Sequence, residues 1–359
     1  MHTITGGGGT AISISPGLQA TGGSLQALDY GLSLDTRPEV ALLTRSITIR
    51  GVPQCRVLVS HLFVNGNDFR GSLDLSNVRV NACGSDVLNA VDIGTGVTLA
   101  QEPCDACPPG DADHAGSATI VGSVISDSKT GGVFAVSAIS LIMQDSAVIG
   151  TVGTAVDVRS PLHSPTITGT LVMNAMSATS NPQTQETACF SICSVGSAVC
   201  VAASLKQNVC AGSANAGFLV YAVACGDLMP YAENTAHHAL VGVLIHGRWA
   251  SCVAASGFAA YECSEVGIPS LYGQRGYNVR DIRLSGMVVK TSGVGFTGGF
   301  MCPVGSDCSF SLANSVALSG GSGSVGFRWN EFFNGASVHF PRDVPVQVRW
   351  TLIGHRCLR

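Results

Sequence analysis

Short runs of strand-forming residues recur along this chain, and a glycine-containing turn follows each of them. The run 72–81 alternates apolar and polar residues over most of its length, as a half-buried strand does. Similar runs occupy residues 118–126, 138–149, 281–289 and 309–318. Glycines that precede small or aromatic apolar residues recur as well, for example Gly132 and Gly153, or Gly217 and Gly242. Self-similarity with a period of about 20–50 residues is typical of solenoids, and here it predicts a coil of about 22 residues.

The composition favours β-structure over helices. Charged residues make up 12% of the chain and aromatic residues 6%, whereas 44 of the 359 residues are glycine. Surface helices need charged residues on their outer faces, and few are available here. We therefore predict an all-β fold, a right-handed single-stranded parallel β-helix. A β-sandwich or jelly roll also uses short strands and glycine-rich turns, and it is the alternative.

Fourteen cysteines indicate an oxidising compartment and a disulfide-rich protein, because reduced cytosolic proteins rarely carry so many. All are candidates for disulfides: Cys55, Cys83, Cys104, Cys107, Cys189, Cys193, Cys200, Cys210, Cys225, Cys252, Cys263, Cys302, Cys308 and Cys357. Cys104 and Cys107, with His114 nearby, have half of a zinc-site spacing, which leaves metal binding as the rival interpretation for that loop.

Charge and hydropathy argue against a nucleic-acid partner and against a membrane span. The net charge is −4 and the chain has no run of Lys or Arg, so nucleic acid is not an expected partner. No apolar run reaches the length of about 18 residues that a membrane span needs. The start of the chain lacks the features of a signal peptide, and we expect the chain to be one segment of a larger protein.

The densest polar group along the sequence comprises Asp227, Glu233, His237, His238 and His246, followed by Trp249. Glu233 and His237 could form an acid–base pair, and Asp227, His238, His246 and Trp249 could bind a ligand. Glu233 and His246 would converge if they lie on successive coils. The structural alternative is that Asn234 and His237 satisfy backbone groups at a turn. We favour this alternative.

Asp111 and Asp113 are the nearest approach to the carboxylate pair that glycoside hydrolysis requires. They lie in a loop rich in Pro, Gly and Cys, where a solvated loop or a weak calcium site is the expected role. We expect no cofactor. Trp249 could stack on a sugar, or it could fill the core or cap an end of the solenoid.

Two stretches resemble extracellular proteins that join a G8 domain to parallel β-helix repeats, the family of fibrocystin, fibrocystin-L and related hyaluronidases. Residues 37–51 resemble the passage from the G8 domain into the first coil. The second stretch follows the fibrocystin pattern in order, through residues 212–218, 233–238, 242–245 and 252–261. The resemblance implies that residues 1–36 end a G8-like domain or form a lead-in, that residues 37–359 form the β-helix, and that the protein is extracellular or on the cell surface, including ciliary or flagellar surfaces.

One departure from this family bears on function. The hyaluronidase branch carries a histidine-rich early coil, and residues 83–92 contain no histidine at that place. We therefore expect a non-catalytic structural or adhesive module whose partners are other domains or copies of the parent protein, or extracellular glycan. The alternatives are a carbohydrate-active enzyme, such as a polysaccharide lyase or hydrolase, and a scaffold that assembles end to end into filaments.

Overall fold

The chain divides into two units, Met1–Leu42 and Leu43–Arg359. The computed structural model describes residues 3–8, 11–15, 24–27, 32–35, 47–50, 55, 57–59, 61–64, 67–84, 90–93, 116–136, 138, 140–159, 164–177, 187–192, 203–246, 251–269, 281–291, 293–298, 308–319, 325–329 and 336–339. All regular elements among these residues are β-strands. In the first unit, β1 (Thr3–Gly8) pairs with β2 (Ala11–Ser15), and β3 (Ser24–Ala27) pairs with β4 (Leu32–Asp35), both antiparallel.

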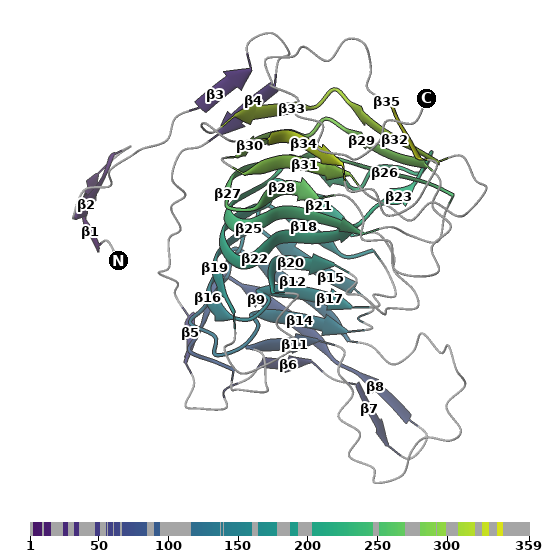
Figure 1. Ribbon diagram of the computed structural model, residues 1–359. Coiled ribbons are helices and arrows are strands. Elements are labelled where there is room, and N and C mark those ends of the chain that lie inside the picture. Colours follow the sequence, from purple (N-terminus) through teal and green to yellow (C-terminus); the bar gives the residue numbers. More distant parts are fainter. Residues whose placement is uncertain are drawn as a thin grey trace. The chain divides into compact units, whose positions relative to one another are not determined.

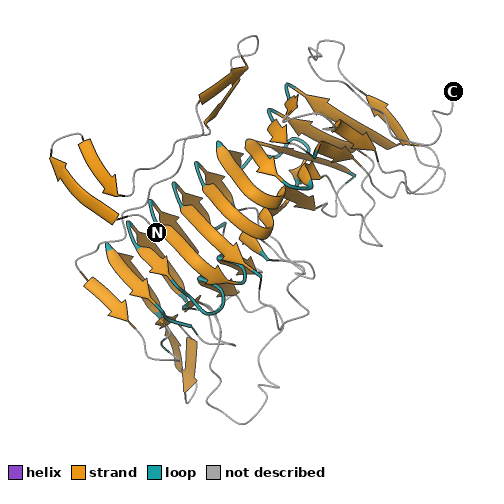
Figure 2. Ribbon diagram, turned by 60° about the vertical axis from the view of Figure 1, so that its left-hand side comes forward, coloured by secondary structure: helices purple, strands orange, loops and turns teal. Residues whose placement is uncertain are grey.

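The second unit is a parallel β-helix, in which each coil lies directly on the one before (Figures 1 and 2). A coil contributes up to three strands, such as β15 (Ser140–Gln144), β16 (Ala147–Val152) and β17 (Val156–Arg159). Each strand pairs in parallel with its equivalent in the next coil. The strands thus form three ladders, named here the first, second and third ladder in the order in which the chain visits them. The predicted β-helix is confirmed, and the sandwich alternative is excluded.

The first ladder consists of β9 (Ser72–Ser76), β12 (Ser117–Val121), β15, β18 (Thr166–Thr168), β21 (Ser204–Lys206) and β24 (Tyr231–Ala232), followed in a separate sheet by β26 (Cys252–Ser256), β29 (Asp281–Ser285), β32 (Cys308–Ala313) and β35 (Ala336–His339). The second ladder contains β5 (Ile47–Arg50), β10 (Val78–Asn81), β13 (Val124–Ser126), β16, β19 (Leu171–Met176), β27 (Phe258–Cys263), β30 (Val288–Thr291) and β33 (Val316–Ser319).

The third ladder contains β6 (Val57–Val59), β11 (Val91–Ile93), β14 (Val133–Val136), β17, β20 (Ala188–Ile192), β28 (Val266–Pro269), β31 (Val294–Gly298) and β34 (Val325–Trp329). Two long strands, β22 (Val209–Tyr221) and β25 (Asn234–His246), run through both the second and the third ladder. A short strand, β23 (Val223–Ala224), pairs antiparallel with β26, and β7 (His61–Val64) forms a hairpin with β8 (Asn67–Arg70).

Coil length varies more than the predicted period of about 22 residues. Val124 pairs with Ala147, and Ala147 with Leu171, which are steps of 23 and 24 residues. Leu171 pairs with Val209, a step of 38 residues. The strands therefore keep their register while the connections between them change in length, as expected when loops of different length leave each coil.

Side chains stack on their equivalents inside the coil. Val80, Ile125, Val148 and Val172 are partners in consecutive strands of the second ladder, and all are buried. In the third ladder, the rings of Phe190 and Phe218 stack with centroids 4.8 Å apart. Because each apolar residue covers the one beneath it, the interior is a continuous hydrophobic column.

The recurring glycines lie where neighbouring coils approach most closely. A Cβ atom on Gly217 would come within 2.5 Å of the carbonyl oxygen of Gly242, and one on Gly242 within 2.4 Å of that of Gly267. These separations leave no room for a side chain, so glycine is required by backbone contact. The glycine repeat in the sequence therefore marks the passage from the second to the third ladder.

A column of buried polar side chains lies at the turn between the first and second ladders, and we call it the turn ladder: Ser123, Ser146, Thr170, Asn208 and Asn234. The Oδ1 atom of Asn208 accepts from the backbone N of Thr170 at 3.0 Å, and that of Asn234 accepts from the backbone N of Asn208 at 3.2 Å. The side-chain amides of Asn208 and Asn234 donate to the carbonyls of Ile167 and Leu205. Backbone groups that the turn would leave unpaired are thus satisfied by the neighbouring coil.

The residue before each member of the turn ladder has a left-handed backbone. Its φ is +55° at Gly122, +46° at Asp145, +59° at Gly169, +56° at Gln207 and +55° at Glu233. Gly, Asn and Asp enter this region at low cost, which accounts for most of the residues used, whereas Gln207 and Glu233 depart from that preference.

Three disulfides join described cysteines: Cys55–Cys83, Cys189–Cys210 and Cys225–Cys252. Cys189 and Cys210 are fully buried, so their bond crosses the interior between β20 and β22. The prediction fails at Cys263, which keeps a buried thiol. Its partner in the next coil is Thr291 rather than a cysteine, and burial raises the pKa of the thiol to about 12. Cys104, Cys107, Cys193, Cys200, Cys302 and Cys357 lie outside the described residues, and the side chain of Cys308 does as well.

Replacement of Asn234 by Ala should destabilise the fold by about 3 kcal/mol. The change removes the acceptor for the Asn208 backbone N–H and the donor for the Leu205 carbonyl, both of which are buried. Urea unfolding of the two proteins measures the difference. Lys206→Ala, an exposed change on the neighbouring strand β21, should alter stability by no more than about 0.5 kcal/mol. Equal stability of Asn234→Ala and wild type would contradict the role of the turn ladder.

Candidate functional site

Strand β25 distributes the predicted site residues along one coil instead of gathering them. Glu233 immediately precedes the strand, His237 and His238 lie within it, and His246 is its last residue. Because β25 crosses from the second to the third ladder, Glu233 and His246 are at opposite ends of a bent strand (Figure 1). The structure does not bring Glu233 and His246 together.

Glu233 lies at the turn that precedes the second ladder. Its carboxylate accepts a hydrogen bond of 2.9 Å from Nε2 of Gln207, the equivalent residue of the previous coil. The next residue, Asn234, is fully buried and bonds to backbone groups of the coil before. Glu233 therefore pairs with Gln207 and not with His237. Asn234 pairs with backbone groups at this turn, as the structural alternative expected, whereas His237 lies at another corner.

His237 and His238 belong to a different corner, where the coil bends between the second and third ladders. The Nδ1 atoms of the two rings are 2.6 Å apart, and His238 Nε2 lies 3.0 Å from Oε2 of Glu262 in the next coil. The ring of His237 stacks in parallel on Tyr261, with centroids 4.6 Å apart. These four residues form what we call the histidine corner. His237 is buried, while His238 and Glu262 are exposed.

Two members of the histidine corner, Tyr261 and Glu262, were not among the predicted site residues. Their proximity follows from the register of β25 and β27, which pairs His237 with Tyr261. Asn234 and Phe258 are partners at the start of their strands, and this pairing sets the step between the two coils. The sequence alone does not show which residues are partners, so Tyr261 and Glu262 could be placed beside the histidines only once the coils had been aligned.

His246 is buried at the end of β25 against the ring of Tyr221, with centroids 5.4 Å apart. Its Nε2 atom is buried without a hydrogen-bond partner. Burial disfavours the charged imidazolium and lowers the pKa of His246 to about 4. The neutral ring thus behaves as part of the packing.

The buried His246 should make the protein sensitive to acid. Because its pKa is about 4 when folded and about 6.5 when unfolded, the unfolded chain binds the proton more readily. This contribution to stability is fully present above pH 6.5 and is lost as the pH falls towards 4, by about 3 kcal/mol in all. His246→Phe removes the titrating group and should flatten that decline in unfolding experiments between pH 7 and pH 4.5. An unchanged pH slope in the variant would contradict this assignment.

The remaining predicted residues lie apart from these corners. Asp227 is exposed in the turn after β23, close in sequence to the Cys225–Cys252 disulfide. Trp249, Asp111 and Asp113 lie outside the described residues. Within the described ranges no group of three or more His, Cys, Asp or Glu side chains is arranged to hold a metal ion. The same residues include no helix that is long and apolar enough to cross a membrane.

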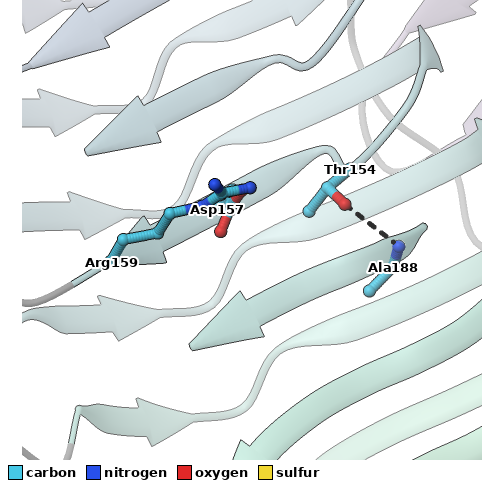
Figure 3. A network of polar contacts seen from close by, with 4 residues as sticks. All are labelled: Thr154, Asp157, Arg159 and Ala188. Carbon is cyan, nitrogen blue, oxygen red and sulfur yellow. Dashed lines mark hydrogen bonds and ion pairs between the residues drawn. The ribbon is translucent and has the colours of Figure 1, made fainter. Parts of the chain in front are cut away.

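An ion pair on β17 between the buried carboxylate of Asp157 and the half-exposed side chain of Arg159 was not predicted. Oδ2 of Asp157 accepts from Nε and Nη2 of Arg159 at 3.0 and 2.8 Å, and the Arg159 guanidinium lies 5.1 Å from the centre of the Phe134 ring. Figure 3 shows the pair beside the hydrogen bond from the Ala188 backbone to Thr154. Burial raises the pKa of Asp157, and Arg159 opposes that rise. The isolated pattern Asp-Val-Arg carries no sequence signal for this burial.

Two known proteins, both fibrocystins, are similar to this chain. Fibrocystin of Mus musculus is 27% identical over 304 residues, which cover 82% of this chain and 7% of the mouse protein. Fibrocystin of Canis lupus familiaris is 26% identical over 251 residues, which cover 68% of this chain and 6% of the dog protein. No protein-family model matches the chain. The chain thus resembles fibrocystin over most of its length and spans a small part of those proteins.

Proposed function

We propose that this chain is a non-catalytic structural and adhesive module, one β-helical segment of a larger extracellular or cell-surface protein. The relationship to fibrocystin and the disulfides between coils support that location. A module of this kind keeps its stacked coils stiff and uses its exposed corners and loops to contact glycan or protein. The G8-like lead-in and the kinship to hyaluronidases remain predictions.

One observation supports the proposal most directly: the two residues that were predicted as an acid–base pair, Glu233 and His237, make their contacts with neighbouring coils instead of with each other. Glu233 holds a left-handed turn and pairs with Gln207, and His237 stacks on Tyr261 one coil further on. A general acid or base must lie within hydrogen-bond reach of the group it acts on. Here the predicted acid and base are directed to separate corners.

A polymer-degradation assay tests the proposal. Purified chain is incubated with hyaluronan, pectate and alginate, with and without a chelator, and polymer length is followed by size-exclusion chromatography. We expect no shortening of any polymer, in wild type or in Glu233→Gln.

Turnover by the wild-type chain would contradict a non-catalytic module. Loss of that turnover in Glu233→Gln would then assign the reaction to the turn residue. Gln207 already occupies the equivalent turn with a left-handed φ, so the substitution keeps a side chain that this backbone accepts.

A further inference from the structure

The outward surface of the first ladder differs sharply from its inward surface. In β9, β12, β15, β18 and β21, side chains alternate between the interior of the coil and the solvent, as in any strand. The outward residues are mostly serine and threonine, so we call the outward surface of these strands the hydroxyl face. The inward residues are apolar, buried and stacked in register, as in the column Leu75, Ile120, Met143, Ile167 and Leu205.

The centre of the hydroxyl face is apolar. Its middle column runs in register through Asp74, Thr119, Ile142, Thr166 and Ser204. Ile142 lies in the central strand, β15, and is 40% exposed. Thr119 and Thr166, which flank it, each carry a methyl group and a hydroxyl. An exposed apolar side chain surrounded by polar residues has the pattern of a contact surface, with an apolar centre and a polar rim.

Two opposite charges lie at opposite ends of the hydroxyl face. Asp74 belongs to β9, two strands before Ile142, and Lys206 belongs to β21, two strands after it. With neighbouring strands about 4.8 Å apart, each charge is displaced from Ile142 by about 10 Å along the stack of coils. Both side chains are exposed, and neither forms an ion pair within the described part of the chain. Each charge is therefore available to a partner.

We propose that the hydroxyl face binds the same face of a second copy of this chain, about a two-fold axis that runs along β15. This rotation lays β9 of one copy over β21 of the other, so Asp74 meets Lys206 of the second copy at both ends of the contact. Ile142 meets Ile142 at the axis, and Thr119 meets Thr166. Two sheets that pack in this way lie about 10 Å apart with their strands nearly aligned.

A second copy fits this face better than a glycan does. A two-fold contact requires each charge to meet its opposite, and the face carries one charge of each sign on either side of its apolar centre. The five strands contain no aromatic residue on which a sugar ring could stack. The inference rests on the proposed adhesive role, for which it names the partner.

The size of the hydroxyl face predicts a weak and reversible contact. Its five strands have up to five residues each, so they cover at most about 400 Å² per copy. A stable interface buries about 800 Å² per partner. Association should therefore depend on protein concentration, and it gains strength where many copies are held on one surface.

Sedimentation velocity of the purified chain, over the widest attainable concentration range, tests the contact. We expect the sedimentation coefficient of wild type to rise with concentration towards that of a dimer. Ile142→Lys, which places two positive charges at the axis, should remain monomeric throughout. Because Ile142 is exposed in the monomer, this change should leave the far-UV circular dichroism unaltered. Wild type that stays monomeric, or Ile142→Lys that associates as wild type does, would overturn the proposal.

An exchange of the two charges distinguishes the two-fold contact from non-specific aggregation. Asp74→Lys alone, or Lys206→Asp alone, puts like charges together at both ends, and each should weaken the dimer about 10-fold. The double variant Asp74→Lys/Lys206→Asp should recover wild-type association, and a failure to recover would overturn the two-fold arrangement. Arg283→Glu, an exposed change on β29 outside the hydroxyl face, is the matched control and should associate as wild type does.

The outcomes are separate from those of the polymer-degradation assay. A monomeric chain that leaves every polymer intact would overturn the dimer and leave the non-catalytic module standing, whereas a dimeric chain that shortens a polymer would do the reverse. Monomeric wild type that binds dextran, with loss of this binding in Ile142→Lys, would assign the face to glycan and overturn the dimer.

Discussion

The hydrogen bond between Asn208 and Asn234 shows the constraint on which the whole fold depends. A parallel β-helix turns its backbone sharply in every coil, and each turn leaves buried N–H and C=O groups that water cannot reach. The turn ladder satisfies them by contributing a side chain from the adjacent coil, with the Asn234 oxygen accepting from both the backbone and the side chain of Asn208. Coils are thus bound to their neighbours at the points where the strands stop.

The stacking of coils also determines which partners the polar side chains contact. A residue in this fold faces its equivalent in the next coil, whatever lies beside it in the sequence. Glu233 therefore meets Gln207, and His237 meets Tyr261, although Glu233 and His237 are close in sequence. The histidine corner is the exception, since the left-handed φ of His238 turns two consecutive side chains towards each other. The turn residue Glu233 and the histidine corner therefore lie at different corners of the same coil.

The coil repeat and the turn residue Asn234 could be predicted from the sequence because, at each of these positions, one physical requirement determines the residue type. Glycine at positions such as 217 and 242 is required by close backbone approach, and its spacing revealed the coil. Asn234 was correctly interpreted as a turn residue, because a buried amide can pair with backbone groups on both sides. The similarity to fibrocystin was also visible in short motifs and is confirmed by the alignments.

The contacts of the histidine corner and the burial of Asp157 could not be predicted, because they depend on which residues are partners in neighbouring coils. The sequence does not show this register, since the connecting loops differ in length. Glu262 and Tyr261 reach the histidine corner through a step of 24 residues, whereas the step from Arg79 to its partner Val124 is 45 residues. Asp157 is buried against Arg159 by its neighbouring coils, and its own surroundings in the sequence do not indicate it. Among the described cysteines, Cys263 keeps a buried thiol, and it lies opposite Thr291 in the register.

Hydrogen exchange of backbone amides tests most directly the claim that the turn ladder holds the coils together. The amides of Thr170 and Asn208, whose only acceptors in this ladder are side chains of the next coil, should exchange as slowly as the central strand amides, through global unfolding. Exchange of these amides by local opening, at rates like that of the exposed turn at Asp227, would contradict the account.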